Sequence, residues 1–305
     1  MPSLLPDGMH VFERGWLSSN NILLDDGHTS WLVDSGYAAH ADQTLTLVES
    51  QLGSRRLDGL INTHLHSDHC GGNSALQEKY PSLVTFIPPG QAAFVKNWDS
   101  AALTYDATGQ QCPKFTYNQT LLPGTDIRLG SFTWQIYAAP GHDPDAVLLF
   151  EPDRRLLISG DALWENGFGV VFPELEGLNA FDEVRATLDL IENLAPEIVI
   201  PGHGRVFRYT PEAMSIARQR LQAFVASPTR HARHAVKVLL KFKLLEVQQQ
   251  PVEQFMQWAK ATPYLHLCKT RFFKEMEFSL FIEQMCAELV DSKVARIRDD
   301  VIYNA

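Results

Sequence analysis

Short apolar runs that end in polar residues alternate with helical spacing over the first 208 residues. The runs HTSWLVDSG (28–36) and LDGLINTH (57–64) predict buried strands. Between them, ADQTLTLVESQLG (41–53) predicts a helix that is closed by Gly53. Alternating strands and helices are typical of an α/β fold.

The next part of the chain predicts two hairpins and a further helix and strand. DIRLGSFTWQIYAAPGH (126–142) predicts one hairpin, and AVLLFEPDRRLLISGD (146–161) predicts another with Pro152-Asp153 in its turn. Apolar residues at helical spacing predict a helix over 179–196, and EIVIPGHG (197–204) predicts a short strand that enters a glycine loop. Residues 88–125 look like a long loop.

After Thr210 the pattern becomes mostly helical. Helices are predicted over 211–226, 230–247, 251–261 and 271–290, and the last residues predict a hairpin that turns at Asp299-Asp300. We therefore predict two domains, 1–208 and 209–305.

Composition agrees with a globular protein of this size. The 305 residues are 45% hydrophobic and 20% charged, which leaves room for one large and one smaller domain. The four cysteines form no CxxC motif, the N-terminus does not look like a secretory signal, and no apolar run approaches the roughly 18 residues of a membrane helix. We expect a cytoplasmic protein without a membrane partner.

The net charge of −10 is unevenly distributed along the chain. Residues 227–305 contain 12 Lys and Arg against 9 Asp and Glu, so residues 1–226 carry a net charge of −13. An acidic main body opposes broad binding of nucleic acid, so we expect no nucleic-acid partner.

The segment INTHLHSDHCGGN (61–73) carries the strongest chemical signal. It places His64, His66, Asp68 and His69 within six positions, with glycines behind them that let the chain bend. Imidazoles combined with a carboxylate suit zinc, iron or manganese better than calcium or magnesium. The alternative is a polar loop with unrelated histidines.

One loop cannot complete two metal shells, so further ligands must come from elsewhere. Three candidates each follow an apolar strand and have a glycine beside them: His142 in AAPGHD, Asp161 in LISGDAL and His203 in VIPGHG. The isolated histidines are interpreted as ordinary surface or core residues; they are His10, His28, His40 and His266.

In this order, HLHSDH, the isolated PGH, the SGD and the final PGHG resemble the metallo-β-lactamase-fold hydrolases. Asp34 in LVDSG matches the first motif of that family, an aspartate that supports the metal loop. The resemblance covers about residues 9–208 and implies an αββα sandwich with a dinuclear site at one edge. The C-terminal part resembles the winged-helix-like tail of some family members.

The same resemblance implies how seven residues would share the metals. One ion would be held by His64, His66 and His142, the other by Asp68, His69 and His203, and Asp161 would bridge them. The chain departs from the glyoxalase-type pattern after the third histidine, where Asp143-Pro144-Asp145 replaces a Thr-Pro-Gly type of sequence. Asp143 either accepts a hydrogen bond from a ligand histidine or forms a turn.

We therefore predict a binuclear metal-dependent hydrolase that holds two divalent transition-metal ions, with zinc first and iron or manganese as alternatives. A hydroxide that bridges the metals would attack a small acyl ester, thioester or lactone, and Asp68 would orient it as the catalytic residue. A small phosphodiesterase is the alternative. A single-iron relative and a regulatory protein that binds nucleic acid through its C-terminal subdomain also stay open.

Other residues have two interpretations each. Trp164, Phe168, Trp98 and Tyr105 could line the substrate pocket or pack in a core, and Cys70 is interpreted as a packing residue. The basic face of the helix predicted over 230–247 could cover the catalytic domain, form a homodimer or bind nucleic acid. Its members are Arg230, Arg233, Lys237, Lys241 and Lys243.

Overall fold

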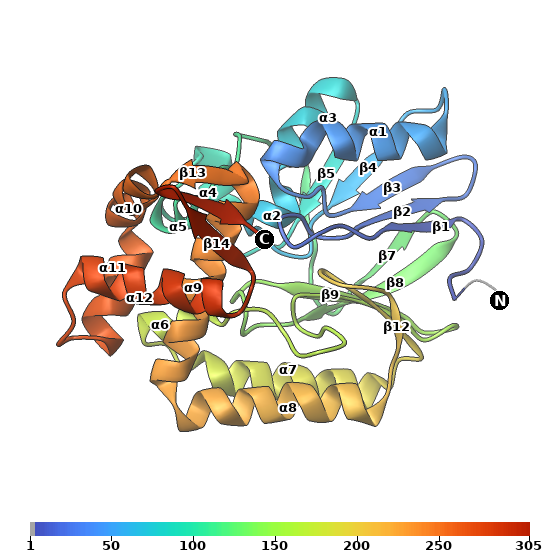
Figure 1. The fold of residues 1–305 in the computed structure, drawn as a ribbon. Helices are drawn as coiled ribbons and strands as arrows, with labels where there is room; N and C mark the ends of the chain where they lie inside the picture. Colours follow the sequence, from blue (N-terminus) through green and yellow to red (C-terminus); the bar gives the residue numbers. More distant parts are fainter. Residues whose placement is uncertain (1–3) are drawn as a thin grey trace.

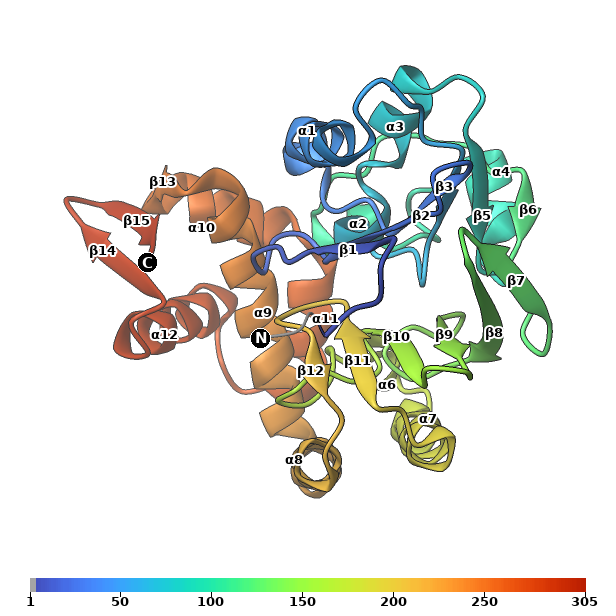
Figure 2. The same ribbon diagram turned by 90° about the vertical axis from the view of Figure 1, so that its right-hand side faces the viewer.

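The computed structural model describes residues 4–305 and contains two facing six-stranded sheets with helices on their outer sides (Figures 1 and 2). Helices α1 and α3 cover one sheet, and α7 and α8 lie outside the other. The remaining helices gather at one end of this sandwich. The predicted αββα architecture with a mostly helical C-terminal part is thus confirmed.

The first sheet has its strands in sequence order. Strands β1 to β3 are antiparallel, and β3 to β6 are parallel. The strands are β1 (Met9–Phe12), β2 (Asn21–Asp25), β3 (Ser30–Val33), β4 (Gly59–Ile61), β5 (Val84–Ile87) and β6 (Gln119–Thr120). The short 3-10 helix η1 (Ala38–His40) and the helices of this half are α1 (Ala41–Leu52), α2 (Ser67–Cys70), α3 (Asn73–Lys79), α4 (Ala92–Asn97) and α5 (Tyr105–Thr108).

The second sheet runs in the order β12-β11-β10-β9-β8-β7. It contains both predicted hairpins, and its parallel pair β10–β11 is joined by the predicted helix α7. The strands are β7 (Asp126–Leu129), β8 (Phe132–Ala138), β9 (Val147–Glu151), β10 (Leu156–Gly160), β11 (Ile198–Pro201) and β12 (Phe207–Arg208). The helices are α6 (Phe172–Glu176), α7 (Ala180–Leu194) and α8 (Pro211–Ala226).

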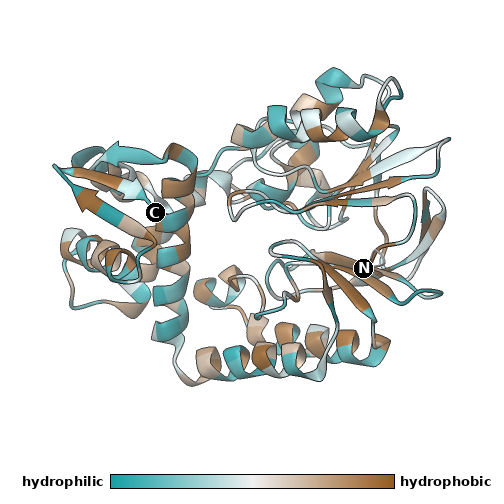
Figure 3. Cartoon of the chain, turned by 45° about the vertical axis from the view of Figure 1, so that its right-hand side comes forward, coloured by the Kyte–Doolittle hydropathy of each residue, from teal (hydrophilic) through white to brown (hydrophobic). Residues whose placement is uncertain are grey.

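The core of the sandwich lies between the two sheets, where the strands are strongly apolar (Figure 3). Ile22 and Val33 of the first sheet belong to the same cluster as Trp134 and Ile158 of the second. Burial of each such side chain stabilises the fold by about 1.5–3 kcal/mol relative to an exposed position. Because apolar side chains fill the space between the two sheets, the polar side chains that could take part in a reaction lie in the loops at the edges of the sandwich.

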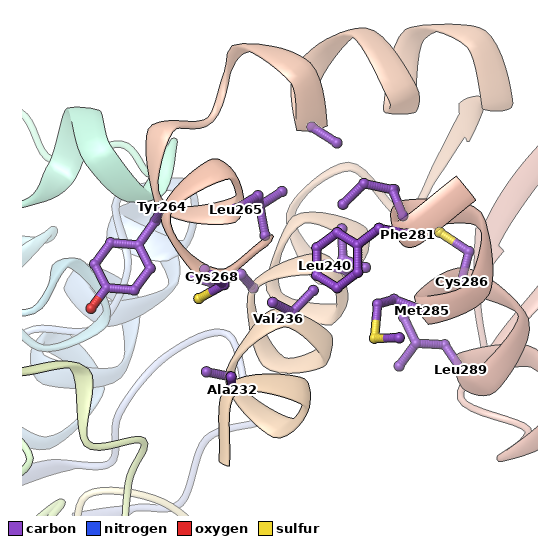
Figure 4. Close-up of a cluster of buried hydrophobic side chains, with 14 of the residues drawn as sticks. Ala232, Val236, Leu240, Tyr264, Leu265, Cys268, Phe281, Met285, Cys286 and Leu289 are labelled. Atoms are coloured by element: carbon purple, nitrogen blue, oxygen red, sulfur yellow. The ribbon is translucent and has the colours of Figure 1, made fainter. Parts of the chain in front are cut away.

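The C-terminal part packs around a second hydrophobic core, which also takes in Val170 and Leu175 from the region around α6 (Figure 4). Leu240 of α9, Leu265 of α11 and Phe281 of α12 meet there with no exposed surface. A small sheet in the order β13-β15-β14 completes this part, and β14 and β15 form the predicted hairpin. The elements are α9 (Pro228–Val247), β13 (Gln249–Pro251), α10 (Val252–Ala261), α11 (Pro263–Phe272), α12 (Phe278–Asp291), β14 (Ala295–Arg298) and β15 (Val301–Asn304).

Two predictions for secondary structure are wrong. The single helix predicted over 271–290 is broken between α11 and α12, because Glu277 caps α12 by accepting hydrogen bonds from the backbone N–H groups of Ser279 and Leu280. Helix α11 itself, which starts with Pro263, and strand β13 were not predicted. The long loop expected over 88–125 contains α4, α5 and β6.

Helix α8 shares its core with the second sheet and α7. Met214, Leu221 and Phe224 of α8 pack in the same cluster as Phe181 and Leu188 of α7. The division into domains 1–208 and 209–305 therefore stays a prediction, and α8 is the element that joins the two parts.

Most of the basic face of α9 is bound within the molecule. Arg233 and Lys237 both pair with Glu288, and Lys243 pairs with Glu246. Lys241 donates to the backbone oxygen of Val294.

None of the helices described between residues 4 and 305 combines the length and apolar character needed to cross a bilayer.

His231 ties α9 to the loop before α6. Its Nε2 accepts a hydrogen bond from the backbone N–H of Val171 at 3.3 Å, and its ring packs against Phe181 and Phe224. Burial, helped by nearby His234, lowers the pKa of His231 to about 3. The folded chain therefore holds this imidazole neutral as a hydrogen-bond acceptor.

This burial predicts a pH-dependent stability. As pH falls from about 6.5 towards 3, the unfolded chain protonates His231 while the folded chain does not, so stability is lost at up to about 1.4 kcal/mol per pH unit. His231→Gln keeps an acceptor that does not titrate, so it should lose less stability over this range. Urea unfolding between pH 7.5 and 5, with chelator present, measures both slopes, with exposed His266→Gln as the control. Equal slopes in wild type and His231→Gln would contradict this role.

Candidate metal centre

Seven imidazole and carboxylate side chains meet at one edge of the sandwich. Four come from the segment after β4, which continues into α2, and the other three follow β8, β10 and β11. They form three overlapping groups in which the potential ligand atoms lie within 4.8 Å of one another. The groups are His64, His66 and His142; His64, His69 and Asp161; and Asp68, His69 and His203.

Glycines let these loops approach one another closely. A Cβ atom on Gly202 would lie 2.2 Å from Oδ1 of Asp161 and 2.8 Å from Cε1 of His69. A Cβ atom on Gly169 would lie 2.4 Å from Nδ1 of His142. Any larger residue at these two positions would displace the cluster.

Hydrogen bonds to one ring nitrogen orient three of the histidines. Nδ1 of His64 lies 3.1 Å from Oγ1 of Thr63, and Nδ1 of His142 lies 2.5 Å from the backbone oxygen of Val170. Nδ1 of His69 lies 2.8 Å from Oδ2 of Asp34. This arrangement leaves Nε2 of each ring available to the cluster, as in metal sites where an outer hydrogen bond sets the ligand orientation.

Two of these free nitrogens have no hydrogen-bond partner among residues 4–305. Nε2 of His64 and Nε2 of His69 are both buried and form no hydrogen bond, although Oδ1 of Asp161 lies 3.4 Å from Nε2 of His69. Buried polar atoms without a partner are costly and call for an explanation such as a bound ion. The donor set therefore fits divalent transition metals.

His66 is oriented differently from the other histidines. Its Nδ1 lies 2.8 Å from Nε2 of His142, and its Nε2 lies 3.8 Å from Oδ2 of Asp143. Asp143 also accepts a hydrogen bond from Gln91 at 3.2 Å and one from the backbone N–H of Asp145 at 2.8 Å. Asp143 therefore forms a turn, while its carboxylate lies near His66 without accepting a hydrogen bond from it.

Asp34 supports the loop that carries most of the cluster. Its carboxylate accepts hydrogen bonds from the backbone N–H and the hydroxyl of Thr63, both at 2.8 Å, in addition to its contact with His69. Its backbone has a φ of 58°, and the residue is 1% exposed. This is the supporting position that the sequence motif implied.

The ionisation states also suit metal ligands. Burial lowers the pKa of His66 and of His142 to about 4, so both rings are neutral at pH 7. Burial alone would raise the pKa of Asp161, but His203 and His69 lower it well below its usual value. Neutral His66 and His142 and an ionised Asp161 are in the forms that bind metal. Burial lowers the pKa of His69, but Asp34, Asp161 and Asp68 outweigh it and raise that pKa well above its usual value, so this ring would release a proton on binding metal.

A cavity of about 420 Å³ opens over the cluster. Trp16 stacks on His203 with ring centroids 5.4 Å apart, and Trp164 lies against the same ring at 5.5 Å. Nε1 of Trp164 donates to Oδ1 of Asp161 at 3.2 Å. Phe94, Phe172 and Tyr264 also line the cavity, which gives it a largely apolar wall.

Of the aromatic residues singled out in the sequence, Trp164 alone lines the cavity. Phe168 packs in the core shared by α7 and α8, and Trp98 and Tyr105 pack around Phe115. Cys70 is fully buried with its sulfur 3.2 Å from the hydroxyl of Tyr105, which agrees with a packing role. The isolated histidines lie outside the cluster; they are His10, His28, His40 and His266.

Several lining residues were not found from the sequence. Trp16 and Phe94 carry no motif, and Tyr264 belongs to the unpredicted helix α11. Arg220 lies on a predicted helix, but its position on the cavity depends on how α8 packs.

The fold and the cluster together define a metal-dependent hydrolase architecture. The family model of the metallo-beta-lactamase superfamily matches residues 14–203, and the chain belongs to this superfamily. A hydroxyacylglutathione hydrolase of Brucella anthropi is 28% identical over 151 residues, which is 50% of this chain and 46% of that protein. The match thus spans about half the length of that relative.

Two solved structures are similar over different extents. A beta-lactamase domain protein from Burkholderia ambifaria has a TM-score of 0.59 at 20% identity and covers 99% of this chain and 94% of its own. A protein solved in a di-iron-bound form has a TM-score of 0.52 at 26% identity, over 68% of this chain and 96% of its own. The first likeness extends through the C-terminal part.

The geometry predicts different costs for two neighbouring carboxylates. Oδ1 of Asp161 lies 3.4 Å from Nε2 of His69, and Oδ2 lies 3.4 Å from Nε2 of His142, so Asp161→Ala should abolish the binding of at least one ion. Asp143→Ala should weaken metal affinity by about 10–100-fold, as is typical of residues that orient a ligand. Chelator competition measures both, with exposed Asp153→Ala in the β9–β10 turn as the control. Equal losses in the two variants would show that their roles are misassigned.

Proposed function

We propose that the chain is a binuclear metal-dependent hydrolase that acts on a small acyl ester, thioester or lactone. The observation that carries this proposal is the cluster of imidazoles and carboxylates, with two unpaired ring nitrogens, at the base of a largely apolar cavity.

Two metal ions would be held by the two sets of ligands. His64, His66 and His142 would hold one ion, and Asp68, His69 and His203 the other, with Asp161 between them. When bound, such ions lower the pKa of a water molecule towards about 7 and polarise a substrate carbonyl. Zinc, iron and manganese all suit these donors, and the relative solved in a di-iron-bound form supports including iron.

The protein residues would position the reactants. Burial by itself would raise the pKa of Asp68. The opposing effect of His69 and His203 is larger, so the pKa of Asp68 lies below its usual value. Its Oδ2 lies 3.0 Å from Nε2 of His203. The ionised carboxylate can accept a hydrogen bond from the attacking water and so orient it, which supports its assignment as the catalytic residue.

The surroundings favour an acyl substrate over a phosphodiester. Asp143, Asp145 and Glu176 line the cavity, and Arg220 is the single Lys or Arg among the described lining residues. Such a cavity would repel a polyanionic chain. The hydroxyacylglutathione hydrolase relative also supports a thioester or a related acyl compound.

We also propose that the C-terminal part forms a wall of the substrate pocket and does not bind nucleic acid. The internal pairing of Arg233, Lys237 and Lys243 supports this proposal. Helix α12 carries acidic residues and no Lys or Arg, which would disfavour its entry into a DNA groove.

A hydrolysis screen tests the reaction class. Protein reloaded with zinc, iron(II) or manganese should hydrolyse at least one thioester, ester or lactone, and the rate should rise with pH through about 7 as the attacking water ionises. Asp161→Ala, reloaded in the same way, is the control for a contaminating esterase. Efficient cleavage of bis(nitrophenyl) phosphate together with poor hydrolysis of every acyl substrate would overturn the acyl proposal.

A further inference from the structure

The C-terminal part contributes one wall of the cavity above the metal centre. Helix α9 supplies Val238, Leu239 and Phe242, and α11 supplies Tyr264. Tyr264 lies at the edge of the hydrophobic cluster, with its hydroxyl directed away from the other labelled side chains (Figure 4). This hydroxyl donates to the backbone oxygen of Phe172 at 2.7 Å. The wall is thus anchored to the first residue of α6.

Arg220 of α8 lies on this wall with most of its hydrogen-bonding capacity free. Its Nη1 donates to the backbone oxygen of Phe168 at 2.9 Å. No carboxylate of residues 4–305 lies within 4.0 Å of its guanidinium, and burial lowers the pKa of Arg220 from its usual value. Arginine nevertheless stays charged in proteins, so a partly buried cation faces the cavity without a counter-charge.

The loop beside Arg220 is shaped around the guanidinium. Gly167 has a φ of 124°, and a Cβ atom there would lie 2.8 Å from the guanidinium carbon of Arg220. The glycine therefore leaves room for the arginine side chain to lie flat against the loop.

Two neighbouring basic residues have carboxylate partners, unlike Arg220. Arg218, two positions earlier on the same helix, pairs with Asp189 at 2.7 Å and with Glu192 at 2.6 Å. Lys237 on α9 pairs with Glu288 at 3.2 Å. Arg220 thus differs from both of these neighbours, because it lines the cavity and has no carboxylate partner.

His234 of α9 adds a second polar group to the same wall. Its ring stacks on Phe224 at 5.6 Å, and neither ring nitrogen forms a hydrogen bond within residues 4–305. Burial, with Arg220 and Lys237 as further causes, lowers the pKa of His234 to about 4. At neutral pH the imidazole therefore offers one N–H donor beside the guanidinium of Arg220.

We propose that Arg220 and His234 form a subsite for one carboxylate of the substrate, remote from the carbonyl that reacts at the metal centre. A guanidinium binds a carboxylate through two parallel hydrogen bonds, and the ligand would supply the counter-charge that the protein lacks. A single guanidinium balances one charge, which favours a carboxylate over a doubly charged phosphate. Val238, Leu239 and Phe242 on the same wall suit an apolar chain that joins the two ends of the substrate.

The subsite rests on the proposed function, since it assumes that substrate occupies this cavity. It refines the substrate class to an acyl ester or thioester that carries a distant carboxylate. A purely structural role, in which Arg220 only holds the loop through Phe168, would affect charged and neutral substrates alike.

Matched substrates separate these two roles. Metal-loaded protein is given thioesters with chains of four to ten carbons that end either in a carboxylate or in its methyl ester. The wild-type chain should prefer the carboxylate form at least about 10-fold in kcat/KM at one or more lengths, as expected for a charge-assisted hydrogen-bonded pair. Arg220→Gln should reduce this preference to near unity, and Arg220→Lys should keep part of it.

Arg218→Gln is the matched control, because it removes an arginine from the same helix outside the cavity. Binding of dicarboxylates and of their monomethyl esters, followed by quenching of Trp16 and Trp164, gives a readout that does not need turnover. Arg220-dependent binding of dicarboxylates without hydrolysis of any acyl substrate would support the subsite and contradict the proposed function.

The subsite would be overturned by either of two results. One is a wild-type chain that shows no preference for the carboxylate form by rate or by binding. The other is an Arg220→Gln variant that keeps the full preference while remaining folded by circular dichroism. A loss that is equal for charged and neutral partners would assign Arg220 to the structural role.

Discussion

The buried cluster of imidazoles and carboxylates is the constraint on which the rest of this structure depends. His64, His69, His142, Asp161 and His203 are all less than a tenth exposed, so their charges and lone pairs must be balanced within the protein or by a ligand. Asp34 balances one side of His69, and Thr63 one side of His64, while the opposite nitrogens face each other. The fold brings the four ligand-bearing segments to one edge because the strands before them end there.

The C-terminal part is linked to this centre by a short chain of contacts. His231 accepts a hydrogen bond from Val171, and the backbone oxygen of neighbouring Val170 contacts Nδ1 of His142. The same helix, α9, carries part of the cavity wall. The cavity wall and the geometry of His142 therefore depend on the same packing, in which Leu240 and its neighbours hold α9 in place (Figure 4).

The sequence predicted most of the strands of the sandwich and the seven residues of the cluster, because both produce recognisable patterns among residues that are close together in the sequence. Alternation and turn residues mark the β7–β8 and β9–β10 hairpins, and the four ligand-bearing segments each follow an apolar strand. The break between α11 and α12 was not predicted, because apolar residues continue through Phe272 and Phe273 and the local cap by Glu277 was not recognised in the sequence. The sequence did not predict that the cavity is lined by Trp16, Arg220 and Tyr264. Their positions on the cavity wall depend on packing between segments that are distant in the sequence.

Metal stoichiometry is the most direct measure of the central claim. Elemental analysis of purified protein, after reloading with zinc or iron and removal of excess metal, should give two ions per chain, since the seven donors exceed one tetrahedral shell. Spectroscopy of a cobalt-loaded sample should then show two sites with different donor sets, one richer in imidazole and one that includes Asp68. A reproducible ratio at or below one ion per chain would contradict the dinuclear centre.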